Sequence, residues 1–339
     1  MRLLITGGMG FIGAALVRRL LLQHDCSILN VDKLTYAASP ARLADNLPHP
    51  KHQFVAADVC DLAGLETLVT EFDPDAIIHL AAETHVDRSI SNPGDFVRSN
   101  ILGSHALLEA SRQHFDRLPQ ERRNKFRLHL VSTDEVFGAL GDDGYFTEHS
   151  PYSPNSPYSA SKASADMLAR AWQQSYGLPV IISRSSNNYG PWQHPEKLIP
   201  TVLAAAMERR AIPIYGNGGN VRQWLHVEDH VSALTAILAR GQPGESYNVG
   251  GGTEATNLEV VTALCRAMDQ LAPGGAPHAE MIRFVTDRPG HDWRYASKSD
   301  KLRQALGWHP TISLTEGLFQ TTSWYLDNRD WWQAMASAT

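Results

Sequence analysis

The chain has 339 residues, which is long for one compact core and suggests two closely joined lobes. With 43% hydrophobic and 19% charged residues, its composition is typical of a globular enzyme. The formal net charge of −6, with no block of Lys and Arg, argues against a nucleic-acid-binding protein.

The cysteines and the apolar runs indicate the compartment. Cys26, Cys60 and Cys265 are scattered without ligand or redox spacing, which is typical of a reduced compartment. The sequence has no charged-then-apolar leader and no apolar run of membrane-spanning length. We therefore expect a cytoplasmic protein without membrane or nucleic-acid partners. His226 and His230 are one helical turn apart, but no third ligand stands out, so we predict no metal site.

The first strand and its turn predict a dinucleotide site. An apolar run over 2–6 leads into Gly7, Gly10 and Gly13, and a helical pattern follows at once. Glycines at this spacing permit a tight turn and close approach to a pyrophosphate at a helix N-terminus. A second strand over 27–31 ends in Asp32, about 20 residues further on, where an acid binds the ribose hydroxyl. Because a carboxylate repels a 2′-phosphate, the pattern favours NAD over NADP.

Strands and helices continue to alternate along the first half of the chain. Further strands are predicted over 53–57, 76–80, 126–132 and 180–185, with a long helix over 96–115 between them. Such repetition predicts an α/β fold with a Rossmann-type, doubly wound parallel sheet covered on both faces. Asp58, which could reach the adenine, and Ala81 and Ala82, which suit a passing cofactor, follow strand ends; alternatively these are ordinary loop residues.

Polar residues after the strand over 126–132 are the candidates for catalysis. Asp134 and Glu135 come directly after that strand, at the sheet edge where open parallel sheets bind ligands. Two adjacent carboxylates would be costly to bury there without a function. Tyr158 and Lys162 follow on one face of a predicted helix, where the ammonium is expected to lower the pKa of the phenol and make it a usable base.

Beyond residue 188 the regular alternation weakens and turn residues multiply. We expect residues 1–188 to bind NAD and carry the catalytic residues, and 189–339 to form a smaller C-terminal α/β lobe, with some chain exchange between them. Planar guanidinium groups at Arg222 and Arg288 suit phosphate contacts, although both could be surface arginines. The candidate ligand groups of this lobe are Glu196, Lys197, Tyr215, Arg222, Asn257, Arg288 and His291.

Motifs spread over nearly the whole chain resemble those of the extended short-chain dehydrogenase/reductases (the NAD-dependent epimerase/dehydratase family) and, among them, the dTDP-glucose 4,6-dehydratases. The resemblance is carried by segments 6–13, 31–37, 79–89, 133–135, 158–162, 187–191, 195–200 and 287–292. The glycine and Tyr/Lys motifs are those of the superfamily, whereas the Asp-Glu doublet after Thr133 is that of the dehydratases.

The resemblance implies a hydro-lyase that converts dTDP-glucose into dTDP-4-keto-6-deoxyglucose with NAD. Tyr158 would take the proton of the C4 hydroxyl while a hydride passes from C4 to NAD⁺, and Thr133 would hydrogen-bond that hydroxyl. Lys162 would hold the nicotinamide ribose. The new ketone would acidify the C5 proton, which Glu135 would remove, and Asp134 would protonate the departing C6 hydroxyl before hydride returns to C6.

The resemblance also implies binding residues and an assembly. The cofactor would contact Gly7, Gly10, Phe11, Ile12, Gly13, Asp32, Lys33, Thr35, Asp58, Val59, Ala81, Ala82, Tyr158 and Lys162. Thr84 and Asn187 would join the nucleotide-sugar ligands of the second lobe. A homodimer is implied, packed through the helices over 96–115 and 158–176.

Several positions depart from the family pattern and leave the nucleotide and the exact sugar open. They are Phe137, Trp192, Gln223, His226 and Trp293. A dehydratase of UDP-glucose or UDP-N-acetylglucosamine is one alternative. A nucleotide-sugar 4-epimerase is another, but it needs no acid/base pair for C5 and C6. A non-catalytic NAD-binding regulator should have lost the catalytic set, which is intact.

Overall fold

The computed structural model describes residues 1–23, 25–287 and 290–337. Its largest element is a seven-stranded sheet in which every neighbouring pair of strands is parallel. The order across this sheet is β10 (Ser246–Val249), β6 (Val180–Ser185), β5 (Arg127–Thr133), β4 (Ala76–His79), β1 (Arg2–Thr6), β2 (Ser27–Asp32) and β3 (His52–Ala56). The predicted α/β fold is confirmed.

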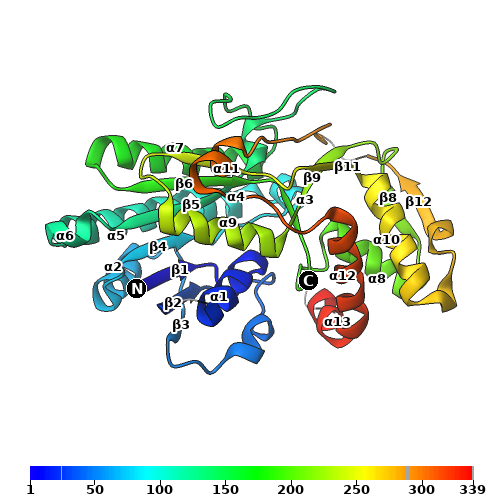
Figure 1. The fold of residues 1–339 in the computed structure, drawn as a ribbon, viewed down its shortest axis with the longest axis horizontal. Coiled ribbons are helices and arrows are strands. Elements are labelled where there is room, and N and C mark those ends of the chain that lie inside the picture. The colour runs from blue at the N-terminus through cyan, green and yellow to red at the C-terminus, as the bar shows by residue number, and fades with distance from the viewer. Residues whose placement is uncertain (24, 288–289, 338–339) are drawn as a thin grey trace.

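Helices cover both faces of this sheet (Figure 1). On one face α1 (Phe11–Gln23) packs against α9 (Val227–Arg240). On the other, α5 (Gly103–Arg117) lies between α2 (Leu62–Phe72) and α7 (Pro157–Tyr176). Because successive side chains of a strand point to opposite faces, Leu3 and Ile5 enter the core with α1, whereas Leu4 enters the core with α2 and α5.

The predicted helix over 96–115 is interrupted near its start. Helix α4 (Pro93–Phe96) is followed by a π-helical turn, η2 (Val97–Leu102), before α5 begins at Gly103. By contrast, α7 is one continuous helix with a strong start signal. The Ser156 and Ser159 side chains form a capping box there, and Pro157 occupies the first turn, where its missing N–H costs nothing.

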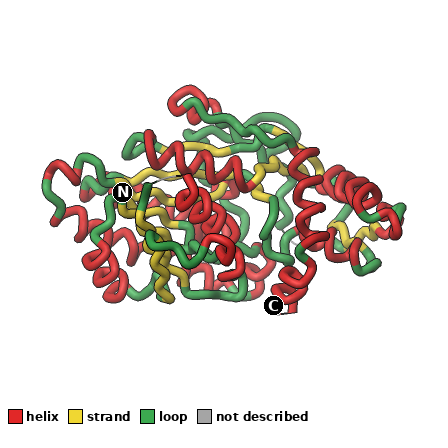
Figure 2. The backbone as a smooth tube through the Cα atoms, turned by 60° about the horizontal axis from the view of Figure 1, so that its bottom comes forward, coloured by secondary structure: helices red, strands yellow, loops and turns green. Residues whose placement is uncertain are grey.

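The second half of the chain builds a separate core but also returns to the large sheet. Strand β10 pairs with β6, and α9 packs on α1, so both belong structurally to the first lobe. The second core is carried mainly by the helices over 198–207, 257–271, 314–327 and 329–337, which Figure 2 shows at the far end from the large sheet. We propose that the main boundary between the two lobes lies near residue 188, and that β10 and α9 cross back into the first lobe.

The other elements are short or belong to the second lobe. The strands are β7 (Asn187–Tyr189), β8 (Ile212–Tyr215), β9 (Val221–His226), β11 (Thr253–Thr256) and β12 (Ile282–Val285). The helices are α3 (Val86–Ser91), α6 (Gln120–Arg123), α8 (Leu198–Met207), α10 (Asn257–Leu271), α11 (Asp300–Leu306), α12 (Leu314–Asp327) and α13 (Arg329–Ser337). Tight 3-10 turns occur at η1 (Pro40–Asn46), η3 (Asp134–Phe137), η4 (Pro273–Gly275) and η5 (His278–Met281).

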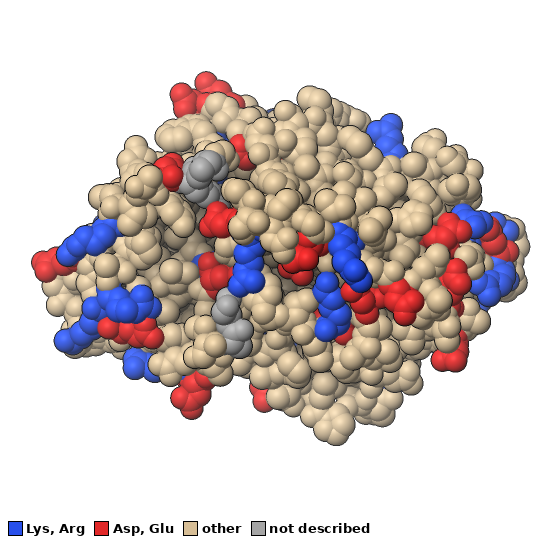
Figure 3. All heavy atoms as spheres, turned by 180° about the vertical axis from the view of Figure 1, so that it is seen from behind, with Lys and Arg blue, Asp and Glu red and all other residues tan. Residues whose placement is uncertain are grey.

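The surface carries charges of both signs. On the face shown in Figure 3, acidic and basic side chains are interspersed rather than gathered by sign. In the part of the chain that the structure describes, no helix is both long and apolar enough to cross a membrane.

Candidate active site

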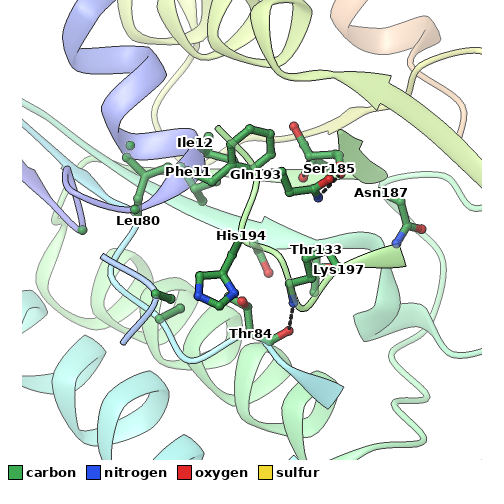
Figure 4. A pocket seen from close by; sticks show the side chains of 18 of the residues that line it. Phe11, Ile12, Leu80, Thr84, Thr133, Ser185, Asn187, Gln193, His194 and Lys197 are labelled. Carbon is green, nitrogen blue, oxygen red and sulfur yellow. Dashed lines mark hydrogen bonds between the residues drawn. The ribbon is translucent and has the colours of Figure 1, made fainter. Parts of the chain in front are cut away.

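Three adjoining cavities lie where the carboxyl ends of the central strands meet the second lobe. The first, of about 270 Å³, is lined by the glycine turn, by the end of β5 and by the start of α7 (Figure 4). The second, of about 90 Å³, extends past the end of β2 and shares Gly7, Gly10 and Ala82 with the first. The third, of about 340 Å³, opens into the second lobe and shares Glu135 and Asn187 with the first.

The structure places nearly all predicted site residues around these cavities. The first is lined by Gly7, Gly10, Phe11, Ile12, Gly13, Ala82, Thr84, Thr133, Asp134, Glu135, Tyr158, Lys162, Asn187, Glu196 and Lys197. The second adds Asp32, Lys33, Thr35, Val59 and Ala81. The third adds Tyr215, Arg222, Asn257 and His291.

Two predicted residues stand apart from this arrangement. Asp58 lines none of the three cavities; its Oδ1 accepts a hydrogen bond from the Cys60 amide at 2.9 Å. This hydrogen bond shapes the turn after β3, and a contact between Asp58 and the adenine stays a prediction. Arg288 lies outside the described residues.

The glycine turn has the shape that a dinucleotide requires. Gly7 has φ +75°, and a Cβ atom there would lie 2.5 Å from the Ala81 amide nitrogen. A Cβ atom at Gly13 would lie 2.1 Å from the Gly7 carbonyl oxygen. Side chains at these two positions would therefore collide with the backbone, and their absence permits the tight turn and the close helix packing of the dinucleotide-binding motif. The residues present fit NAD on these grounds.

Two backbone amides fix the Asp32 carboxylate at the end of β2. Its Oδ2 accepts the Met9 amide at 3.0 Å and its Oδ1 accepts the Leu34 amide at 2.8 Å. Each carboxylate oxygen has a second lone pair, so both can still accept ribose hydroxyls. The same negative charge disfavours a 2′-phosphate, which agrees with the prediction of NAD.

The carboxylate pair sits in the short turn η3 that ends β5. Asp134 is 1% exposed, and burial, followed by the neighbouring Glu135 carboxylate, raises its pKa to about 8. Arg222 and a hydrogen bond at 3.4 Å from the Ser297 hydroxyl act in the opposite direction on that pKa. Asp134 is therefore a neutral acid at pH 7, beside a second carboxyl group in the same cavity. Such a difference in environment is how two carboxyl groups take opposite proton-transfer roles.

Tyr158 and Lys162 lie on the buried face of α7, as predicted, but their electrostatics differ from the expectation. Burial and the nearby Glu135 raise the pKa of Tyr158, while a hydrogen bond with Thr133 lowers it. The Lys162 ammonium donates to the Val131 carbonyl at 2.8 Å, and burial lowers its own pKa to about 8. The prediction of a lowered pKa for Tyr158 is wrong for the protein alone, because burial and the carboxyl groups of Glu135 and Asp134 raise it.

The second-lobe ligands are held by contacts of their own. The Glu196 carboxylate lies 3.7 Å from Arg88 and 3.8 Å from His85, and it accepts the Tyr36 hydroxyl at 3.3 Å. The Lys197 ammonium donates to the Thr84 carbonyl at 3.1 Å, which Figure 4 draws as a dashed line. These contacts join the second lobe to the segment after β4 across the mouth of the cavity.

Arg222 is fixed in the wall of the third cavity. Its guanidinium donates to the Asp292 carbonyl at 2.9 Å and lies 4.5 Å from the centre of the Tyr295 ring. It is 5% exposed, so it is not a surface arginine, and it lines the third cavity together with Glu135. Nearby, His291 is hydrogen-bonded to Asp287 at 2.7 Å.

Sequence reasoning missed several residues of the site. Ser297 reaches Asp134 from 163 positions away and belongs to no motif. Arg42 lines the first cavity from η1, which also has no motif. Gln193 and His194 line it too and lie just after the predicted segment 187–191, so extending that segment would have found them.

The departures from the family pattern lie outside the ligand walls. Phe137 packs against Phe146 and Tyr152, and Gln223 accepts the Ser297 amide at 3.2 Å. His226 caps the start of α9. Within the described ranges, none of Phe137, Trp192, Gln223, His226 and Trp293 lines any of the three cavities. These five positions therefore contribute no side chain to the walls of the three cavities.

Comparison with known proteins identifies the class. The family described as GDP-mannose 4,6 dehydratase matches residues 4–321, so the chain belongs to this family of nucleotide-sugar enzymes. Among its relatives, the dTDP-glucose 4,6-dehydratase of Neisseria meningitidis is 48% identical over 98% of this chain and 95% of the relative. A probable dTDP-glucose 4,6-dehydratase of Sinorhizobium fredii is 50% identical over 99% of this chain and 95% of its own.

Solved structures agree with this assignment. The dTDP-glucose 4,6-dehydratase of Streptomyces venezuelae, crystallised with NAD, superposes with a TM-score of 0.91 at 42% identity. The match covers 99% of this chain and 100% of that one. The predicted resemblance to these dehydratases is confirmed.

Proposed function

We propose that the protein is an NAD-dependent hydro-lyase that converts dTDP-glucose into dTDP-4-keto-6-deoxyglucose. The observation that carries this proposal is the buried, protonated Asp134 beside Glu135, in one cavity with Tyr158. A 4-epimerase would need the tyrosine but no acid/base pair. Two observations support dTDP-glucose as the substrate. The residues that depart from the family pattern do not line the cavities, and the relatives include dTDP-glucose 4,6-dehydratases.

The first proton transfer falls to Tyr158. Its phenolate oxygen takes the proton of the C4 hydroxyl, and the Thr133 hydroxyl, which hydrogen-bonds the phenol, positions both groups. When bound, NAD⁺ accepts the C4 hydride and later returns it to C6, and its positive ring adds a charge that favours the phenolate. Lys162 supplies a second positive charge at the foot of the same cavity.

Elimination of water falls to the carboxyl pair. The C4 ketone acidifies the C5 proton, which the Glu135 carboxylate removes. Asp134 gives its proton to the C6 hydroxyl, so the C6–O bond breaks and water leaves. Each positioned proton transfer of this kind is worth about 10²–10⁴-fold in rate. At the end, Glu135 returns a proton to C5, Tyr158 releases the proton of the C4 hydroxyl to solvent, and Asp134 takes one proton from solvent.

The test is product analysis on a panel of nucleotide sugars. The purified protein, incubated with dTDP-, UDP-, GDP- and CDP-glucose, is expected to lower the mass of dTDP-glucose by one water. A control variant, Glu245→Gln, changes an exposed carboxylate that pairs with Lys301 away from the cavities, and it should behave as the parent does. Epimerised product of unchanged mass, or dehydration of UDP-glucose alone, would contradict the proposal.

We also propose a cytoplasmic homodimer formed through the outer faces of η2 and α7. Large apolar side chains lie exposed there in the single chain: Val97 is 48%, Leu102 55%, Met167 53% and Tyr176 51% exposed. The free state of all three cysteines agrees with a reducing compartment. Light scattering should give the dimer mass for the parent and the monomer mass for Met167→Glu. A parent that is monomeric at micromolar concentration would contradict this part.

A further inference from the structure

Arg42 is a buried cation in the wall of the cofactor cavity. It lies in η1, after β2, and is 1% exposed. It lines the first cavity together with Gly7, Gly10 and Gly13 of the glycine turn. An arginine is rarely buried so completely unless its charge has a partner.

Three backbone carbonyls hold the guanidinium in place. Nη1 donates to the Met9 carbonyl at 2.8 Å, inside the glycine turn, and to the Ala37 carbonyl at 2.7 Å. Nε donates to the Trp192 carbonyl at 3.0 Å, which belongs to the second lobe. One side chain therefore ties the glycine turn, the loop after β2 and the second lobe together.

Aromatic residues of the C-terminal helices close the other side. The Arg42 guanidinium lies 5.4 Å from the centre of the Trp331 ring, and the Trp331 indole donates to the Ser39 hydroxyl at 3.1 Å. Trp331 in turn packs on Trp192, with ring centres 5.0 Å apart. The guanidinium is therefore held in one orientation by both lobes.

The Arg42 guanidinium has no anion in direct contact among the described residues. Burial lowers its pKa to about 10, although the nearby Tyr325 and Asp32 act in the opposite direction, so it stays protonated at neutral pH. In the described part of the chain its hydrogen-bond acceptors are all carbonyls, no ion pair includes it, and Nη2 is buried without an acceptor. A buried charge that no direct ion pair compensates is unfavourable. The position beside the glycine turn is where a dinucleotide places its diphosphate.

We propose that Arg42 is a positioning residue that retains the cofactor: it supplies the counter-charge to the NAD diphosphate and fixes the glycine turn to the second lobe. The inference rests on the proposed use of NAD. It predicts that binding of the diphosphate relieves the unpaired charge, and that closure of the two lobes on Arg42 slows the escape of the cofactor between turnovers.

Direct binding measurements on cofactor-stripped protein test this inference. Arg42→Gln removes the charge, whereas Arg42→Lys keeps the charge but loses the planar set of guanidinium donors. Arg240→Gln is a matched control, because the Arg240 guanidinium donates to the Leu306 carbonyl, away from the cofactor cavity. We expect Arg42→Gln to weaken NAD⁺ and ADP-ribose by about 10- to 100-fold, the range for a lost charge-assisted contact. Arg42→Lys should lose less, and the control nothing.

The salt dependence of the affinity separates an electrostatic role from a structural one. Salt screens the attraction between Arg42 and a diphosphate, so the loss in Arg42→Gln should be larger at low salt than at high salt. Equal losses in the Gln and Lys variants at all salt concentrations, or unchanged affinity in Arg42→Gln, would overturn the inference. A negative result for Arg42 would not affect the proposed function, provided that the parent protein still dehydrates dTDP-glucose.

Discussion

Replacement of Asp134 by Asn should stabilise the fold while it abolishes dehydration. Burial and Glu135 raise the pKa of this carboxyl from an ordinary 3.8 to about 8 in the folded protein. Between these values the folded protein holds a proton that the unfolded chain has lost. The free energy of unfolding therefore falls as the pH rises through this window, by about 1.4 kcal/mol per pH unit. At about pH 7 the accumulated penalty is about 4 kcal/mol.

Asparagine has nearly the same shape and cannot ionise, so the penalty disappears in the variant. Urea unfolding of parent and Asp134→Asn, at equal cofactor occupancy, should show their difference growing in favour of the variant by about 4 kcal/mol between about pH 5 and about pH 8. Any effect of the substitution on stability that does not depend on pH cancels, because only the change of the difference with pH is compared. Asp143→Asn, at an exposed carboxylate, is the matched control and should show no such trend. A difference that is constant with pH would refute the claim that Asp134 is held neutral.

Three other variants test the remaining roles. Glu135→Gln should still reduce bound NAD⁺ when dTDP-glucose is added, but eliminate water about 10²–10⁴-fold more slowly; rapid-mixing absorbance should show NADH building up, and normal turnover would remove Glu135 as the base. Tyr158→Phe should block the first step, so NADH formation at the parental rate would count against that assignment. Asp166→Ala should cost about 3–5 kcal/mol in urea unfolding, because it leaves buried Arg184, 2.8 Å away, without its partner; a cost below about 1 kcal/mol, the value of a surface pair, would refute this reasoning.

The parts of the fold that depend on local pattern could be predicted from the sequence. The glycine turn, the strand ending in Asp32 and the alternation of strands with helices follow from residue spacing over a few tens of positions. So does the shared face of Tyr158 and Lys162, because residues four apart lie one turn apart on a helix. In the structure the glycine turn, Tyr158 and Lys162 line one cavity at the carboxyl ends of the central strands.

Contacts between distant segments could not be predicted in this way. The hydrogen bond from Ser297 to Asp134 joins two lobes, and no spacing rule relates the two residues. The return of β10 to the first sheet depends on its packing against β6, which its four residues do not specify. The π-helical turn at Val97–Leu102 likewise adds a local irregularity to a segment whose apolar period is that of one helix.

The error at Tyr158 has the same origin. The spacing of Tyr158 and Lys162 indicates proximity, but a pKa depends on every charge and on the burial around the phenol. Glu135 and Asp134 both act to raise it, and neither lies near Tyr158 in the sequence. Sequence reasoning placed these groups in one site, as the cavity does, but could not weigh their opposing effects on the pKa.

The central claim is that one hydride leaves C4 of the sugar and returns to C6 of the same molecule. dTDP-glucose carrying deuterium at C4 tests this directly, with the product analysed by NMR and mass spectrometry. The account predicts one deuterium at C6 of dTDP-4-keto-6-deoxyglucose, with no label in free cofactor. Loss of the label to solvent, its recovery in released reduced cofactor, or its retention at C4 would contradict the account.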